Sequence, residues 1–212
     1  MKRLVFDCSG DIASVAVFHQ EELLAELSVT GKKNHASILL PTIDDCLKEA
    51  DLCFADIDEV YVCSGPGSFT GVKVGLATAL GLVAPTRKKL FVFPYAALIL
   101  SKALMIYPRL LDGVSSDFTE HSENGVVALG MDAGRGEMYC TLVEPNEDGV
   151  SVIGSKLMKK DEISAPFVFE HLPARLLMEM PERYRSLFVS EELEPLYFRK
   201  SQAEESLDMR RD

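Results

Sequence analysis

Apolar and polar positions divide the first half of the chain into short strands and longer helices. Residues 4–6, 14–18 and 23–29 are mostly apolar, and polar turns separate them, a pattern typical of a three-strand antiparallel meander. Apolar residues at helical spacing predict helices over residues 36–50, 71–83 and 96–106, and Pro41 should either kink the first or mark its real beginning. Short apolar runs at residues 57–63 and 90–93 predict two further strands. The expected order, β-β-β-α-β-α-β-α, is that of a mixed sheet covered by helices.

The second half of the chain repeats the beginning of this pattern. Residues 126–131 predict a strand that runs into Asp132, and residues 137–143 and 150–157 continue as strands. Asp7 ends the first strand of the first half in the same way. Beyond residue 157 the pattern fades into a charged stretch broken by prolines, with one short helix near residues 175–179.

A duplicated β-β-β-α unit with an Asp at the end of each first strand resembles the actin-like ATPase superfamily, which has a ribonuclease H-like α/β fold. The resemblance implies two lobes, residues 1–107 with residues 200–212 packed on them, and a smaller degenerate lobe of residues 108–199. In that fold the two aspartates and the adjoining turns face a nucleotide cleft. Asp7, Ser9, Asp132 and Gly134 are therefore candidates for a vestigial nucleotide site. The alternative is that each Asp only begins a turn.

A loop rich in Gly, Pro and Ser at residues 64–71 (SGPGSFTG) leads into the helix predicted at 71–83, with Thr70 as its expected N-cap. Gly71, Gly75 and Ala79 fall four residues apart on this helix. Because an interior Gly costs a helix about 1 kcal/mol relative to Ala, a close contact must offset it. Packing within the chain's own domain and packing against a partner helix both remain open. The glycine spacing matches neither a P-loop nor a dinucleotide-binding fingerprint.

Composition narrows the classes of function. The chain has 212 residues and a formal net charge of −11, which argues against unaided binding to nucleic acid. Five cysteines without a C-x-x-C pair are typical of a reducing compartment. We find no signal peptide and no uncharged run of about 18 residues, the length that spans a bilayer. The expectation is a cytoplasmic protein without a membrane segment.

Candidate catalytic chemistry is sparse. His35 begins the first predicted helix, but no second His follows at metal-ligand spacing, so a cap or an interface contact is the better interpretation. Asp44 and Asp45 are more typical of a solvated helix face than of a metal site in so acidic a chain. The four histidines lie in no recognisable catalytic motif. We therefore expect neither intrinsic catalysis nor an intrinsic metal or cofactor.

Five segments, in order along the chain, resemble the bacterial tRNA threonylcarbamoyladenosine biosynthesis family TsaB, also called YeaZ. They are residues 4–9 (LVFDCS), 35–44 (HASILLPTID), 64–76 (SGPGSFTGVKVGL), 131–139 (MDAGRGEMY) and 195–199 (PLYFR). The block at 64–71 is the most specific of them. Residues 105–124 and 159–194 match poorly.

The resemblance implies a non-catalytic subunit, a degenerate paralogue of TsaD. TsaD carries the metal and nucleotide and transfers threonylcarbamoyl to the adenosine next to the anticodon, in tRNAs reading codons that begin with A. TsaD and the small ATPase TsaE are the implied partners, with a homodimer as an option in isolation and tRNA contacted only through the complex. ATP or ADP and metal are expected on the partners.

By the same analogy, helices 36–50 and 71–83 form the dimer seam. Its expected residues are His35, Leu39, Ile43, Leu47, Gly71, Val72, Gly75, Leu76 and Ala79. Two alternatives remain, a stand-alone actin-like ATPase built on Asp7 and Asp132, and a metallopeptidase-like hydrolase with His35 as a ligand.

Overall fold

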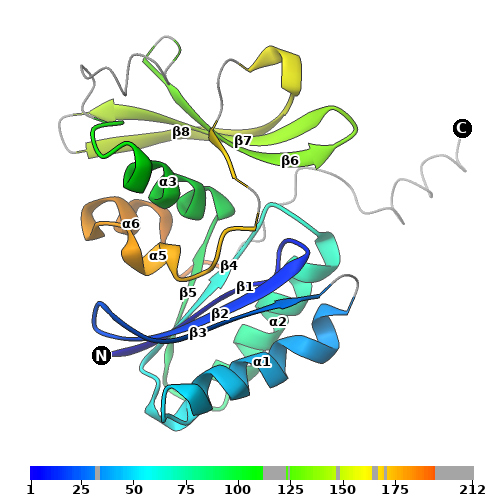
Figure 1. The fold of residues 1–212 in the computed structure, drawn as a ribbon, viewed down its shortest axis with the longest axis vertical. Helices are drawn as coiled ribbons and strands as arrows, with labels where there is room; N and C mark the ends of the chain where they lie inside the picture. The colour runs from blue at the N-terminus through cyan, green and yellow to red at the C-terminus, as the bar shows by residue number, and fades with distance from the viewer. Residues whose placement is uncertain are drawn as a thin grey trace, which may run out of the picture.

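Two mixed sheets with the same strand order form the two lobes (Figure 1). The computed structural model describes residues 1–31, 34–111, 123, 125–146, 149–163, 167–169 and 171–193. The first sheet has the order β3-β2-β1-β4-β5 and the second the order β8-β7-β6-β9. In both, three antiparallel strands form a meander and the next strand pairs parallel with the first of them. The repeat predicted from the sequence is confirmed, as is the actin-like α/β fold.

The bounds of the predicted strands differ from the observed ones by a few residues at most, whereas β9 has no predicted counterpart. The first sheet consists of β1 (Lys2–Asp7), β2 (Ile12–His19), β3 (Glu22–Thr30), β4 (Glu59–Cys63) and β5 (Lys89–Phe93). The second consists of β6 (Val127–Gly134), β7 (Glu137–Asn146), β8 (Gly149–Lys159) and β9 (Phe167–Val168). Single-turn 3-10 helices lie at Phe54–Asp56 and Lys160–Glu162.

The helices form two layers around the first sheet. Helices α1 (His35–Glu49) and α2 (Phe69–Val83) cover its outer face. Helices α3 (Tyr95–Ile106), α5 (Leu176–Glu179) and α6 (Glu182–Phe188) lie between the two sheets (Figure 1). Strand β1 is buried on both faces, since Leu4 and Phe6 pack toward α1 and α2 while Val5 packs into the core between the sheets. Burial on both faces explains why β1 is an unbroken apolar run rather than an alternating one.

Two local expectations are wrong. Ser68, not Thr70, is the N-cap of α2, and its hydroxyl accepts a hydrogen bond from the Gly71 amide at 3.3 Å. Helix α1 does not begin at Pro41 but continues through it, with the Thr42 hydroxyl donating to the Ile38 carbonyl at 2.8 Å, and the alternative of a kink stays a prediction.

A segment of the expected second lobe, residues 108–199, also contacts the first sheet. Helix α6 has no counterpart among the predicted elements, and both α5 and α6 fall within the residues assigned to the second lobe. Their segment nevertheless bonds to the first sheet: the Ala174 amide donates to the Ser14 hydroxyl at 2.9 Å, and Ser190 forms an antiparallel bridge with Val92. The chain therefore returns to the first lobe after completing the second. The predicted packing of residues 200–212 and the segment 195–199 lie outside the described residues.

Candidate functional site

A cavity of about 500 Å³ lies between the two lobes. Its wall is formed by the ends of β1 and β6, the start of β2, the loop before α2, the start of α3 and residues following β9. The polar and aromatic residues that line it include Asp7, Ser9, Asp11, Ser68, Tyr95, Asp132, Tyr139, Phe169 and His171. The structure thus brings Asp7, Ser9 and Asp132 to one cavity, as the duplicated pattern predicts. Gly134 is the last residue of β6. That a nucleotide binds these residues stays a prediction.

The buried wall of the cavity centres on Asp7, whose exposed fraction is 3%. The Ser9 amide donates to the Asp7 Oδ1 atom at 2.8 Å. Burial raises the pKa of the Asp7 carboxyl, an effect only partly offset by hydrogen bonds from Ser9 and Cys63 and by the charge of nearby His35.

The opposite wall is solvated. Asp132 is exposed, and its carboxylate pairs with the Lys160 ammonium at 2.8 Å. The two aspartates that the sequence places at equivalent positions therefore differ in environment. One is a desolvated carboxyl, and the other belongs to a surface ion pair of the kind that contributes less than about 1 kcal/mol.

The loop before α2 packs directly on the end of β1. A Cβ atom at Gly67 would lie 2.3 Å from the Ser9 carbonyl oxygen, and one at Gly71 would lie 2.0 Å from the Cys8 carbonyl oxygen. The Ser68 amide donates to the Ser9 carbonyl at 2.6 Å. This backbone contact explains the two glycines, because no side chain fits between the loop and the strand.

The chemistry available near the cavity is limited. Among the described residues, no group of three or more His, Cys, Asp or Glu side chains could hold a metal ion. Burial raises the pKa of the Cys8 and Cys63 thiols, so both stay protonated and poorly nucleophilic at neutral pH. His35 is buried and its Nδ1 atom has no hydrogen-bond partner. Asp44 and Asp45 pair with Lys48 on the exposed face of α1, which agrees with the solvated face that the sequence suggests.

The residues expected to form the dimer seam are buried within the first lobe, and their contact with a partner stays a prediction. Leu39 and Ala79 are 0% exposed. The others, His35, Ile43, Leu47, Gly71, Val72, Gly75 and Leu76, are buried as well. A Cβ atom at Gly75 would meet Cys8 Sγ at 3.1 Å and Val62 Cγ2 at 3.5 Å. The small residues of α2 therefore let the helix approach its own sheet, the domain-internal alternative that the sequence leaves open.

The outward faces of the same helices carry apolar side chains that the seam prediction overlooked. Leu40 on α1 is 51% exposed and Leu80 on α2 is 44% exposed. The two helices contact each other, and each carries one of these exposed leucines. We call this surface, defined by the exposed positions Leu40, Pro41, Ala77, Leu80 and Gly81, the α1–α2 face.

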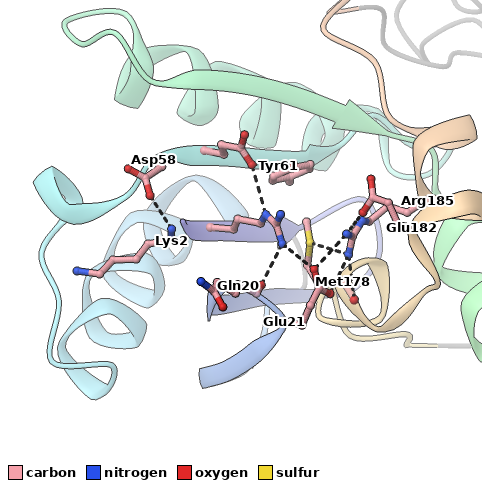
Figure 2. Close-up of polar contacts among 10 residues, drawn as sticks. Lys2, Gln20, Glu21, Asp58, Tyr61, Met178, Glu182 and Arg185 are labelled. Atoms are coloured by element: carbon pink, nitrogen blue, oxygen red, sulfur yellow. Dashed lines mark hydrogen bonds and ion pairs between the residues drawn. The ribbon is translucent and has the colours of Figure 1, made fainter.

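A polar cluster joins residues 174–190, which we call the return segment, to the first sheet (Figure 2). The buried Arg3 guanidinium donates to Glu59 at 3.3 Å, Glu21 at 3.2 Å and the Gln20 carbonyl at 3.0 Å. Arg185 on α6 reaches the same Glu21 at 3.4 Å and the Met178 carbonyl at 3.1 Å, and pairs with Glu182. Sequence analysis missed this cluster because 164 positions separate Glu21 from Arg185. No local pattern marks a pair so distant.

None of the helices in the described part of the chain has the length and apolar character needed to cross a membrane.

Comparison with known proteins gives a consistent result. A family model described as TsaD, tRNA N6-adenosine threonylcarbamoyltransferase, matches residues 22–166. The tRNA threonylcarbamoyladenosine biosynthesis protein TsaB of Bacillus subtilis is 27% identical over 144 residues, which cover 68% of this chain and 56% of that protein. TsaB of Buchnera aphidicola subsp. Schizaphis graminum is 30% identical over 106 residues, half of each chain. The chain thus spans about half the length of these curated relatives.

Among solved structures, YeaZ from Pseudomonas aeruginosa shares the fold with a TM-score of 0.61 at 22% identity, covering 78% of this chain and 70% of that one. A structure described as an uncharacterized protein with similarity to peptidase YeaZ, from the same organism, gives a TM-score of 0.70 at 20% identity and covers 93% of this chain and 99% of that one.

Proposed function

The chain belongs to the family of TsaB and TsaD proteins, and from this membership we propose that it is a non-catalytic subunit required for threonylcarbamoylation of tRNA. The modified base is the adenosine next to the anticodon, in tRNAs that read codons beginning with A. A TsaD homologue is the partner that carries the chemistry, and a TsaE homologue joins the complex.

The observation that carries the partner role is the apolar α1–α2 face. Large apolar side chains exposed together on neighbouring helices are typical of a protein interface. Leu40 and Leu80 extend outward while Leu39 and Ala79 hold the same helices on the sheet. The buried residues thus shape the surface, and the exposed ones contact the partner, which is a TsaD homologue or, in isolation, a second copy of this chain.

The charge of the chain supports an indirect role toward tRNA. A net charge of −11 repels the phosphate backbone, so the basic surface that nucleic-acid binding requires is supplied by a partner. ATP or ADP and metal likewise reside on the partner subunits.

Reconstitution tests the proposal. Threonylcarbamoylation of tRNA by TsaD and TsaE homologues is measured with and without this chain, and we expect activity only with it. The double variant Leu40→Asp/Leu80→Asp should lose association with TsaD and lose activity, while its thermal unfolding stays near that of the wild type because both side chains are exposed. Gly75→Leu is unsuitable as a probe, because the new side chain would collide with Cys8.

Leu23→Asp is the matched control, since Leu23 is also an exposed leucine, 40% exposed, but lies on β3 and on neither helix. It should leave both association and activity unchanged. Full modification without this chain would refute the subunit role. Unchanged association of the double variant would refute the α1–α2 face as the seam.

A second candidate, a stand-alone actin-like ATPase, is favoured by one observation, the placement of Asp7 and Asp132 at the same cavity. Calorimetry of the isolated protein with ATP and Mg²⁺ separates the two. A dissociation constant below about 100 μM, near −5.5 kcal/mol, together with ATP hydrolysis, would favour the ATPase.

A further inference from the structure

The charge of the cavity between the lobes is opposite to what a phosphate ligand requires. Three of the described residues that line the cavity are aspartates, Asp7, Asp11 and Asp132. No described lining residue is Lys or Arg. Carboxylates gathered around a partly enclosed space create a negative potential that attracts cations and repels anions. A nucleotide would enter this cavity only with metal ions to neutralise its phosphates. The described residues offer no group of three metal-ligating side chains for that purpose.

Asp7 is the buried one of the three aspartates, with an exposed fraction of 3%. Its carboxylate accepts a hydrogen bond from the Ser9 amide, and within the described part of the chain no Lys or Arg forms an ion pair with it. Hydrogen bonds from Ser9 and Cys63 are the largest influences that favour its charged form, and they only partly offset burial. A buried carboxylate of this kind destabilises the fold unless a ligand compensates it. Asp132, by contrast, already has Lys160.

The remaining wall of the cavity is aromatic and apolar. Tyr95, Tyr139 and Phe169 line it from three different elements, together with Met131 and Leu172. Aromatic faces attract organic cations through the ring quadrupole and exclude water from the ion. A volume of about 500 Å³ is within the range of small-molecule sites.

We propose that this cavity binds a small organic cation, an ammonium group attached to an apolar or aromatic body, with Asp7 facing the ammonium and Tyr95, Tyr139 and Phe169 enclosing the body. This inference goes beyond the proposed function and does not depend on it. It also differs from the vestigial nucleotide site expected from the sequence, because the two ligands carry opposite charge.

Benzylamine and benzyl alcohol provide a direct test, since they share the aromatic body and only the amine is charged at pH 7. Binding of each to the full-length chain is followed by calorimetry or by protein NMR shifts, with ATP plus Mg²⁺ as a third probe. We expect benzylamine to bind at least about tenfold more tightly than benzyl alcohol, as a hydrogen bond to a charged group implies. Asp7→Asn should remove this preference and leave the binding of benzyl alcohol unchanged.

Glu49→Gln is the control variant, because it removes one negative charge from the exposed end of α1 and should not alter the preference. Thermal unfolding of Asp7→Asn verifies that the variant folds. Equal affinity for the two probes, or an unchanged preference in Asp7→Asn, would overturn the proposal. The proposal would also be overturned if ATP with Mg²⁺ displaced bound benzylamine at a concentration below the dissociation constant of benzylamine. Because none of these readouts involves tRNA modification, failure here is distinct from failure of the proposed function.

Discussion

The two lobes share a strand order but differ in how their sheets are covered. The first sheet is packed on both faces, by α1 and α2 on one side and by α3, α5 and α6 on the other. In the second, β8 is exposed along most of its length. The same contrast holds for the equivalent aspartates, since Asp7 is buried and Asp132 is paired with Lys160 in solvent.

The difference shows that a repeated topology does not conserve the environment of equivalent residues. The first lobe also receives the segment that returns from the second, bonded through Ala174, Arg185 and Ser190. We therefore expect the contacts of the first lobe to contribute most of the free energy of unfolding. The first lobe also holds the buried Asp7 carboxyl.

The largest expected effect comes from filling the contact between α2 and β1. Gly71→Val places a side chain where a Cβ atom would lie 2.0 Å from the Cys8 carbonyl oxygen, so the helix or the strand must move. We expect a loss of about 3 kcal/mol in the free energy of unfolding, measured by chemical denaturation.

The second lobe offers the matched control for this change. Gly154→Val on β8 introduces the same side chain where a Cβ atom would meet nothing within 4 Å. Its effect should stay within about 0.5 kcal/mol. Similar losses for both variants would contradict the contrast between the lobes.

A smaller loss of stability is expected when the polar cluster of Arg3, Glu21 and Arg185 is disrupted. Arg185→Ala removes a buried guanidinium and leaves the Met178 carbonyl without its donor, which should cost about 2 kcal/mol. Arg183→Ala on the same helix removes an exposed guanidinium that lies 4.7 Å from the Tyr184 ring, and should cost less than about 1 kcal/mol. Hydrogen exchange at the Ser190 amide, which donates to the Val92 carbonyl, should accelerate only in the Arg185 variant. Equal acceleration in both variants would show that the cluster does not hold this segment.

Substitution of the two equivalent aspartates, Asp7 and Asp132, should give the smallest change in the free energy of unfolding. Asp7→Asn should increase the free energy of unfolding at pH 8 by about 1 kcal/mol, because it removes a buried charge while the side-chain oxygen can still accept from Ser9. Asp132→Asn should decrease it by less than about 1 kcal/mol, the usual contribution of a surface ion pair. A loss of stability in both variants would contradict the assignment of Asp7 as a destabilising residue.

The pH dependence of the Asp7 effect follows from its pKa. Burial raises the pKa of the folded carboxyl, so the folded protein keeps this proton to higher pH than the unfolded chain does. The resulting stability is fully present below the unfolded pKa of about 4 and is lost as pH rises through the folded pKa. Denaturation curves of the wild type and Asp7→Asn should therefore converge below about pH 4 and separate above it.

Much of the fold follows from local pattern. The spacing of apolar residues predicts the three-strand meanders and helices α1, α2 and α3, because the burial of one face imposes a period on the sequence. The predicted strands then place one Asp at the end of β1 and another within β6. Helix α6 was missed since its seven residues are too few for a clear period between prolines and charges. The N-cap moved from Thr70 to Ser68, a two-residue error typical of element ends.

Sequence alone indicated the order of most elements, the family and the two aspartates at equivalent positions, because each rests on residues close together or repeated along the chain. Only the tertiary structure decided which side chains meet. It turned Gly71, Gly75 and Ala79 toward the chain's own strands, left Leu40 and Leu80 outside, and joined Glu21 to Arg185. The physical reason is that a small-residue stripe permits close approach without specifying the neighbour. The charge state of Asp7 likewise depends on desolvation by residues distant in sequence.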